Sequence, residues 1–288
     1  MKLRGVFIQD TFAEAWDLEV ARIILTAMEE DVAWAAAHQY AGAAGSSELG
    51  SRINAGVEHA LPPQETPDGR PGVVVALAMP PNRHDQFVEE LATRLVLATL
   101  IPTVAVFDGM LSDVTSTATL DWYALTAHHW AGYEEEREVA GRRVCQVPTT
   151  TGSFIYEKRI TLSLEGTDGH IVCFAESQPA AVMAMKAAKT AITRVGGVSP
   201  MGYGLEQVFR ERDYVPALKH RDPVSKVPAG VRSALNLLMF GVNPARMRDA
   251  MREAVRAACH VDGVLEIGAM NFGGQFGRHQ YWLRELLQ

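Results

Sequence analysis

Residues 61–80, with the sequence LPPQETPDGRPGVVVALAMP, constrain the fold because a stiff loop runs directly into a strand that reads as wholly buried. The backbone dihedral φ is fixed near one value at each of the loop's prolines, Pro62, Pro63, Pro67 and Pro71. The run VVVALA at residues 73–78 then has the length and apolarity of a core strand. This chain must therefore build a packed core next to a polar loop of fixed shape.

Three charged side chains, Glu65, Asp68 and Arg70, lie on this loop. A rigid loop with carboxylates at the end of a core strand is a candidate wall of a ligand site, because binding residues concentrate on loops that a scaffold holds in place. The guanidinium of Arg70 suits bidentate pairing, so we expect it to face a carboxylate, either within the loop or on a ligand. The alternative is an ordinary Pro/Gly connection whose charges are solvated.

The composition is that of a globular protein with a large core. The chain has 288 residues, of which 48% are hydrophobic and 21% charged, and this length favours two lobes over one compact unit. A net charge of -7 without any run of Lys or Arg argues against a nucleic-acid surface. No apolar segment reaches the roughly 20 residues that span a bilayer, and charge follows the N-terminus too soon for a signal peptide. We therefore expect a cytoplasmic protein with no membrane partner.

The cysteines and histidines predict neither disulfides nor a metal site. Cys145, Cys173 and Cys259 are odd in number and far apart, and two of them lie in apolar patterns, which indicates reduced, buried thiols. His128 and His129 are adjacent, so they would point to opposite faces of a strand. The chain also lacks an HExxH motif, a GxSxG elbow and a P-loop.

The hydrophobic pattern predicts strands and helices at both ends of the chain. Strands are expected at residues 5–12, 20–27, 73–78, 101–107, 232–240, 263–269 and 279–287. Helices are expected at residues 28–41, 84–99, 180–194 and 245–258. Two of these helices have cap residues followed by proline, namely Ser177 or Gln178 in one and Asn243 in the other.

The middle of the chain has shorter elements. Alternating segments at residues 120–127, 143–147 and 153–157 predict antiparallel strands. Residues 159–165 and 170–175 flank the sequence Gly-Thr-Asp-Gly, which we interpret as the tight turn of a β-hairpin. Two further polar segments are expected to lie outside strands, a tip at residues 10–17 and a glycine-rich turn at residues 271–277.

These elements together predict an α+β fold. We expect a two-lobed α/β sandwich with ferredoxin-like lobes, in which helices cover mixed, mostly antiparallel sheets. The N-terminal lobe is placed at residues 1–145 and the C-terminal lobe at residues 146–288.

Five segments in fixed order resemble a known enzyme family. They are DTFAEAW at 10–16, PPQETPDGRPG at 62–72, PTVAVFD at 102–108, AESQPA at 175–180 and NFGGQFG at 271–277. The chain resembles formylmethanofuran:tetrahydromethanopterin formyltransferase nearly from end to end. The combination of ETPDGRPG with AESQPA is specific, unlike a single glycine motif.

The resemblance implies transfer of a formyl group between the amine of methanofuran and N5 of tetrahydromethanopterin, which are substrates rather than covalently bound cofactors. It also implies a homo-oligomer, a dimer or tetramer, or a subunit of a formyltransferase/hydrolase complex such as that of methylotrophic bacteria. The abundance of Arg over Lys, and of Ala, favours the bacterial setting. The matching positions imply substrate-binding roles for Asp10, Thr11, Glu14, Glu65, Thr66, Asp68, Arg70, Ser177, Gln178 and Asn271.

Attack of an amine on a formamide passes through a tetrahedral species, so the site needs an oxyanion donor and a group that moves protons. Neither task requires a metal. Glu176 follows an apolar strand and precedes a helix cap, where desolvation would raise its pKa and helix amides would supply donors. We therefore predict a catalytic role for Glu176, with a simple capping role as the alternative.

One position departs from the family pattern. The strand at residues 232–240 is expected to carry a catalytic glutamate, and the matching residue here is Asn236. An amide cannot exchange protons at neutral pH, although it can donate a hydrogen bond to an oxyanion. Two hypotheses follow, an active formyltransferase or a non-catalytic scaffold or ligand-binding subunit, and the retained charges of ETPDGRPG favour the first.

Overall fold

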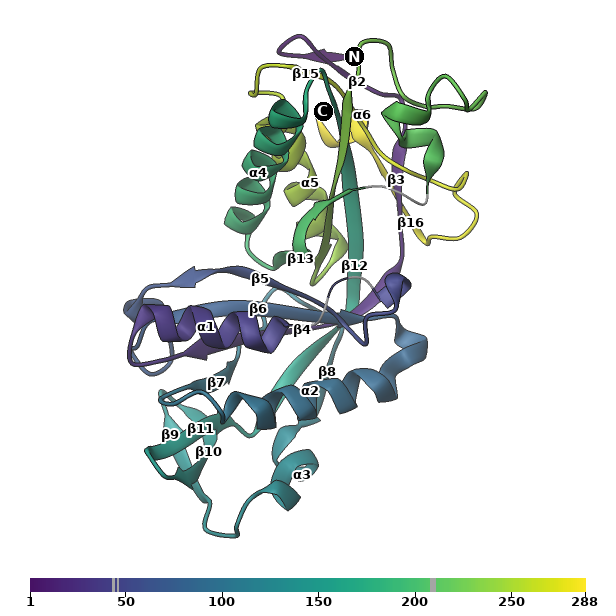
Figure 1. Cartoon of the computed structure of the whole chain (residues 1–288). Helices are drawn as coiled ribbons and strands as arrows, with labels where there is room; N and C mark the ends of the chain where they lie inside the picture. Colours follow the sequence, from purple (N-terminus) through teal and green to yellow (C-terminus); the bar gives the residue numbers. More distant parts are fainter. Residues whose placement is uncertain (43–44, 46, 208–210) are drawn as a thin grey trace. The chain divides into compact units, whose positions relative to one another are not determined.

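The computed structural model describes residues 1–42, 45, 47–207 and 211–288. The chain divides into two compact units, a terminal unit of Met1–Asp17 with Thr167–Gln288 and a central unit of Leu18–Gly166 (Figure 1). Each unit combines helices and strands, which confirms the mixed α+β class. The boundary expected between residues 145 and 146 falls inside the central unit.

The terminal unit contains an almost wholly antiparallel sheet. Its strands are β1 (Lys2–Leu3), β2 (Val6–Ile8), β15 (Val264–Gly268), the second half of β12 (Arg159–Ala175), β14 (Ser233–Gly241) and β13 (Val198–Glu206), in this order. Only the β2–β15 pair is parallel among these neighbours. A separate antiparallel ribbon joins β3 (Phe12–Ala15) to β16 (His279–Trp282).

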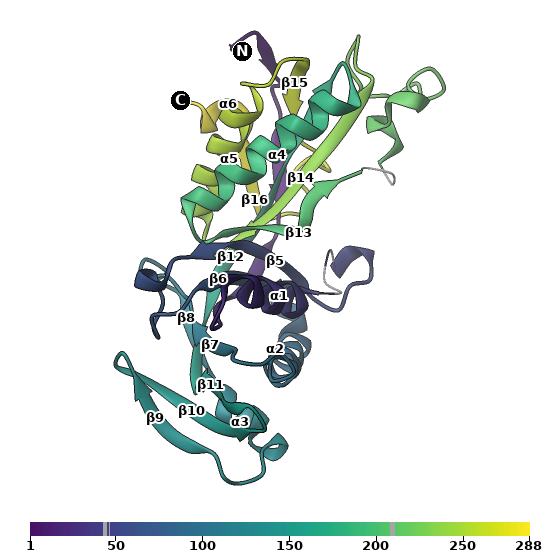
Figure 2. The ribbon, with the colours of Figure 1, turned by 60° about the vertical axis from the view of Figure 1, so that its left-hand side comes forward.

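Two helices, α4 (Gln178–Val195) and α5 (Pro244–Ala258), lie side by side over one face of this sheet (Figures 1 and 2). Each helix begins as the sequence predicts, because the side chains of Ser177 and Asn243 accept the backbone N–H three residues further on. Small alanines and flexible methionines fill the core between helices and sheet. The short helix α6 (Leu283–Leu286) closes the same core.

The strands of the central unit form a mixed series. The strand order is β5 (Asn54–Leu61), β6 (Gly72–Met79), β4 (Asp17–Thr26), β7 (Ala105–Asp108), β11 (Gly152–Glu157), β10 (Arg142–Thr149) and β9 (Glu135–Val139). Only the β7–β11 pair is parallel in this series. The remaining strand, β8 (Thr117–Asp121), pairs with the first half of β12.

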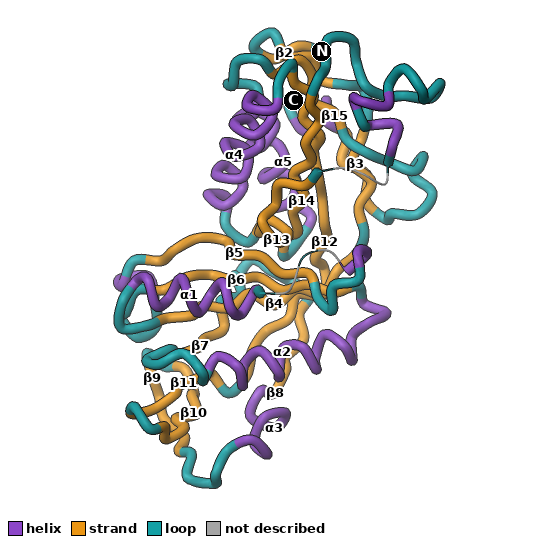
Figure 3. The backbone as a smooth tube through the Cα atoms, in the orientation of Figure 1, coloured by secondary structure: helices purple, strands orange, loops and turns teal. Residues whose placement is uncertain are grey.

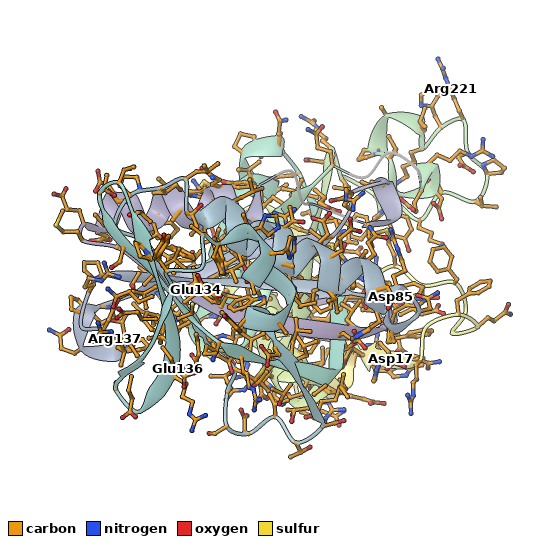
Figure 4. The ribbon with its side chains drawn as sticks, turned by 90° about the horizontal axis from the view of Figure 1, so that it is seen from below. Asp17, Asp85, Glu134, Glu136, Arg137 and Arg221 are labelled. Carbon is orange, nitrogen blue, oxygen red and sulfur yellow. The ribbon has the colours of Figure 1, made fainter. Side chains whose placement is uncertain are left out.

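Helices α1 (Glu30–Ala41), α2 (His84–Ala98) and α3 (Trp122–Thr126) bury their apolar residues in one core with these strands (Figure 3). Short 3₁₀ turns occur at Ser47–Leu49, Pro63–Glu65, Pro81–Arg83 and Ala127–His129, and in the terminal unit at Arg212–Tyr214 and Pro216–Leu218. The charged side chains Glu134, Glu136 and Arg137 gather around the β9–β10 hairpin (Figure 4).

Most predicted elements are confirmed, and several of the errors fall in short segments. The predicted tip at 10–17 contains strand β3, and the segments at 120–127 and 279–287 each change from strand to helix, after Asp121 and after Trp282. Strands β5, β9 and β13 were not predicted, because their hydrophobic residues show no clear periodicity in the sequence. Such segments become strands because a neighbouring strand pairs with them, which local propensity does not report.

The predicted hairpin at 159–175 is wrong, because β12 is one continuous strand of 17 residues. Its first residues pair with β8, and its later residues pair with β14 without a break in register through Thr167, Asp168 and Gly169. A Cβ on Gly169 would lie 2.6 Å from the sulfur of Met247 on α5. Glycine here permits close packing of strand and helix rather than a turn.

The three cysteines are free and buried, as predicted. Within residues 1–42, 45, 47–207 and 211–288, no helix has the length and apolarity needed to cross a membrane. The same residues contain no group of three or more His, Cys, Asp or Glu side chains arranged to hold a metal ion.

Substitution Gly169→Ala tests the close packing of β12 on α5. The added methyl group meets two methionine sulfurs, so we expect a loss of about 1–3 kcal/mol in the free energy of unfolding, measured by denaturant titration. Gly45→Ala is the control, since its Cβ would meet no atom within 4 Å. Equal stability of the two variants would contradict the packing role of Gly169.

Candidate functional site

The glycine-rich loop at residues 271–277 is held by a single carboxylate, that of Glu14 on β3. Glu14 Oε2 accepts the backbone N–H groups of Phe272 at 2.7 Å and Gly274 at 3.0 Å. Its Oε1 accepts those of Phe276 and Gly277, both at 2.7 Å. The carboxylate therefore accepts hydrogen bonds from four amides of one loop. These four bonds occupy all of its acceptor sites.

The loop amides also determine the charge of this carboxylate. Glu14 is only 1% exposed, and burial opposes its ionisation, but the four amide hydrogen bonds outweigh burial and lower its pKa to about 2. A Cβ at position 277 would lie 2.6 Å from Glu14 Cγ and 2.7 Å from the carbonyl oxygen of Ala15. Only glycine therefore allows the loop to close around the carboxylate.

The side chain of Asn271 completes the attachment of the loop to β3 and to the residue before it. The amide nitrogen Nδ2 of Asn271 donates to Thr11 Oγ1 at 3.0 Å and to the carbonyl of Phe12 at 3.2 Å. Three predicted site residues, Thr11, Glu14 and Asn271, thus come together. Asp10 lies next to them in sequence and forms an ion pair of 2.9 Å with Arg284.

His170 on β12 fixes the residue that precedes the loop. Its Nε2 lies 2.9 Å from the backbone nitrogen and 3.0 Å from the carbonyl oxygen of Met270. Burial lowers the pKa of His170 to about 4, and the bond to the Met270 backbone opposes this shift only in part. The imidazole is therefore neutral at physiological pH. The sequence carried no signal for this role, because 100 residues separate the partners.

An ion-pair cluster follows the loop. Asp17 Oδ1 lies 2.8 Å from His279 Nε2, and Asp17 Oδ2 accepts from Arg278 Nη1 at 3.2 Å. Burial opposes ionisation of Asp17, but the hydrogen bonds with His279 and Arg278 prevail and lower its pKa. Asp17, labelled in Figure 4, was not among the predicted site residues.

The start of α4 differs from the expectation for Glu176. This carboxylate is exposed, so the desolvation on which its predicted acid–base role rested is absent. Its backbone N–H donates to the carbonyl of Gly263 at 2.9 Å. Ser177 is the helix cap, and Gln178 is the first helical residue and is exposed.

Asn236 lies on β14, opposite Val172 of β12 and Glu206 of β13. It is 3% exposed, and its Oδ1 has no hydrogen-bond partner in the described part of the chain. Leaving such an acceptor unpaired costs about 1–3 kcal/mol. A buried acceptor of this kind calls for an explanation, such as local strain, a catalytic role or an ordered water.

In the central unit, the loop at 61–72 is fixed by Arg70. The guanidinium lies 2.7 Å from Asp68 Oδ2 and donates to the carbonyl of Thr103 at 2.6 Å. Thr26 Oγ1 also donates to Asp68 at 2.7 Å, and Thr66 Oγ1 donates to the Arg70 carbonyl at 2.7 Å. The expected pairing of Arg70 with a carboxylate inside the loop is confirmed. Glu65 is exposed at the edge of this loop.

Two further charged pairs in the central unit were missed from the sequence. Arg22 and Glu58 form a buried, bidentate pair with distances of 2.8 and 3.0 Å. His84 Nδ1 lies 2.6 Å from Glu19 Oε2. Each pair joins two different elements, β4 with β5 and β4 with α2, so no local sequence motif predicts it.

The structure does not test the expectation that His128 and His129 would point to opposite faces of a strand. They lie in a 3₁₀ turn rather than a strand, and their ring centroids are 4.0 Å apart. The rings are therefore neighbours, because successive residues of a turn do not alternate between two faces.

Family models match most of the chain. The model described as "Formylmethanofuran-tetrahydromethanopterin formyltransferase" matches residues 1–149, and the model described as "FTR, proximal lobe" matches residues 207–286. The formylmethanofuran–tetrahydromethanopterin formyltransferase of Methanopyrus kandleri is 33% identical, with 99% of this chain and 100% of the relative covered. The enzyme of Archaeoglobus fulgidus is also 33% identical over the same shares.

Two solved structures have the same fold. The formylmethanofuran:tetrahydromethanopterin formyltransferase of Methanosarcina barkeri superposes with a TM-score of 0.89 at 31% identity, covering 99% of this chain and 100% of that chain. A chain of the formyltransferase/hydrolase complex of Methylorubrum extorquens, solved with methylofuran, superposes with a TM-score of 0.87 at 26% identity. The coverage in that case is 100% of this chain and 99% of the other.

Substitution Glu14→Gln tests the carboxylate that holds the loop. The neutral amide presents N–H groups where two loop amides need an acceptor, and each unpaired buried donor costs about 1–3 kcal/mol. We expect faster hydrogen exchange at residues 272–277 and a lower free energy of unfolding. The control is Asp17→Asn, whose partly exposed ion pairs are worth at most about 1 kcal/mol. Unchanged exchange in Glu14→Gln would contradict the anchoring role.

The lowered pKa of His170 predicts a stability change in mild acid. In the unfolded chain the imidazole titrates near pH 6.5, so stability is complete above that pH and falls as the pH declines toward 4. The total loss should be on the order of 3 kcal/mol. Melting temperatures from pH 7.5 to 4.5 should decline less steeply in His170→Asn, while the exposed His260→Asn control keeps the wild-type slope. Parallel curves for wild type and His170→Asn would disprove this origin.

Proposed function

Because the chain belongs to the formylmethanofuran–tetrahydromethanopterin formyltransferase family, we propose that it transfers a formyl group between formylmethanofuran and N5 of tetrahydromethanopterin in one-carbon metabolism. The main support is a match of about one residue in three, 33%, along 99% of this chain and 100% of the Methanopyrus kandleri enzyme.

The reaction exchanges one carbon–nitrogen bond for another. N5 attacks the formamide carbon, a new N–C bond forms, and the carbonyl becomes an oxyanion. The bond to the methanofuran nitrogen then breaks, the carbonyl re-forms, and the proton lost by N5 ends on the departing amine. The protein must therefore stabilise an oxyanion and carry one proton between two nitrogens.

We assign the proton transfer to Glu176. Its carboxylate is exposed and free to meet a substrate, and it stands immediately before α4, a helix of 18 residues whose N-terminal amides favour negative charge. Ser177 and Gln178 occupy the cap and first position of that helix and would contact the same substrate.

We propose that Asn236 contacts the reacting groups through its amide. Its unpaired Oδ1 can accept a hydrogen bond from a substrate N–H, and its Nδ2 can donate to an oxyanion. Because the side chain is 3% exposed, substrate would have to displace the residues that cover it.

The other predicted binding residues divide into direct and supporting roles. Asp10 and Glu65 are exposed and are proposed to meet substrate directly. Arg70, Asp68 and Thr66 fix the loop on which Glu65 lies, and Thr11, Glu14 and Asn271 fix the glycine-rich loop.

We further propose that the protein is cytoplasmic, that its two units correspond to two ferredoxin-like lobes, and that it works as a homo-oligomer or within a formyltransferase/hydrolase complex. The similarity to a chain of the Methylorubrum extorquens complex supports the last point. A second candidate function, a non-catalytic scaffold or ligand-binding subunit of such a complex, is favoured by Asn236 in place of a titratable residue.

Substitution Glu176→Gln tests the proposed acid–base role. It keeps shape and hydrogen bonding but removes the titratable group, so the transfer rate should fall at least about 100-fold while substrate affinity changes little. The assay follows formyl-tetrahydromethanopterin spectroscopically. The matched control is Glu29→Gln, which changes another exposed carboxylate directly before a helix, α1.

The outcomes separate the hypotheses. A wild-type rate in Glu176→Gln would transfer the role to the loop carboxylates, beginning with Glu65. If Asn236→Asp is tolerated or faster, a carboxyl suits that position. Complete inactivity of wild-type protein supplied with both substrates would favour the scaffold.

Light scattering of active protein at micromolar concentration should give at least a dimer, and a clean active monomer would exclude oligomerisation as a requirement.

A further inference from the structure

A groove of about 190 Å³ lies between helices α1 and α2 of the central unit, which pack against each other (Figures 1 and 2). The small side chains of Ala36 and Ala98, one on each helix, leave the space between them. The rim of the groove is exposed at Gln39, Thr93 and Leu97, so a molecule in solution can enter it.

Two polar groups on the buried floor of the groove lack partners. Tyr40 is 3% exposed and Arg94 is 8% exposed. Within the residues that the structure describes, neither the Tyr40 hydroxyl nor Arg94 Nε has a hydrogen-bond partner. Burial raises the pKa of Tyr40, and the positive charge of the neighbouring Arg94 opposes this shift only in part, so the phenol is neutral. The floor therefore offers two N–H or O–H donors where buried donors are normally paired.

The rest of the Arg94 guanidinium is fixed by the protein. Its Nη1 donates to the carbonyl of Tyr40, and to that of Gly42 at 3.0 Å, at the end of α1. Its Nη2 lies 3.3 Å from Glu90 Oε2. These bonds hold the Nε–H in place before a ligand arrives, which lowers the entropy lost on binding.

The charges around the floor favour an anion. Glu90 is shared between two guanidinium groups, because Arg52 Nε also donates to its Oε1. One negative charge does not neutralise both arginines. The fourth member of the cluster, Glu89, has a side chain that is 66% exposed, so water screens its charge. An excess of positive charge therefore remains near Arg94 Nε.

The size of the groove limits the ligand. An apolar cavity of about 150 Å³ holds one benzene molecule, so a groove of about 190 Å³ takes a body of that size with one polar substituent. Alanine, leucine and isoleucine side chains form much of its wall and match an apolar body.

We propose that this groove binds a small monocarboxylate with an apolar body, whose two oxygens accept hydrogen bonds from the Tyr40 hydroxyl and from Arg94 Nε–H. The body of the ligand lies between Ala36 and Ala98 and reaches Leu97 at the rim. The site uses none of the residues assigned to formyl transfer.

Benzoate is the probe, because it joins one carboxylate to a flat apolar ring of the right size. Isothermal titration calorimetry with the full-length protein should show saturable binding with a Kd of about 1 mM or lower. Benzamide has the same shape without the charge and should bind at least about 10-fold more weakly, since hydrogen bonds to charged groups are the stronger ones.

Substitution Tyr40→Phe removes one hydroxyl group and should weaken benzoate binding about 10-fold, while the melting temperature stays near that of wild type because the hydroxyl has no partner to lose. Tyr133→Phe is the control, since it removes the hydroxyl of a tyrosine that is 76% exposed in the central unit. Ala98→Leu should fill the groove and abolish binding of benzoate and benzamide alike. If Ala98→Leu does not fold, Tyr40→Phe still decides.

Four results would overturn the proposal. They are the absence of saturable benzoate binding, equal affinity for benzoate and benzamide, wild-type affinity in Tyr40→Phe, and a crystal structure grown with benzoate in which only an ordered water joins Tyr40 to Arg94.

Discussion

The conformation of the glycine-rich loop at residues 271–277 depends on one buried carboxylate with four amide partners. Glu14 carries its charge in a site where water does not compete, and the loop amides stabilise that charge from several directions at once. The loop therefore has one conformation, which fixes the backbone positions of Asn271, Phe272 and Phe276. Glycine at position 277 is a requirement of this arrangement.

The parts of the fold that could be predicted are those with local signals. Helices α4 and α5 follow from Ser177 and Asn243, since a cap and its amide lie three residues apart. Strand β12 could not be predicted, because a glycine at a turn and a glycine under a helix look alike in sequence. The sulfur of Met247 distinguishes the two cases, and it lies on another element.

The same distinction holds for the candidate site. The pairing of Arg70 with Asp68 was predictable because they are two positions apart, whereas Glu14 and Phe272 are 258 positions apart. Glu176 was predicted to be desolvated because an apolar strand precedes it, yet its side chain is exposed. Exposure depends on what packs nearby, and a single sequence does not contain that information. The family motifs located the loops but not the partners that fix them.

The discontinuity of the terminal unit has a consequence for synthesis. Residues 18–166 leave the ribosome as one uninterrupted segment, and the pairs β4–β6, β5–β6 and β4–β7 form between strands of this segment. Strands β2 and β3, made first, pair with β15 and β16, which are made last. Strands β2 and β3 therefore lack β15 and β16 during most of translation, while the central unit can already fold. Co-translational folding of this chain begins in the middle, and the earliest segment is the last to find its place.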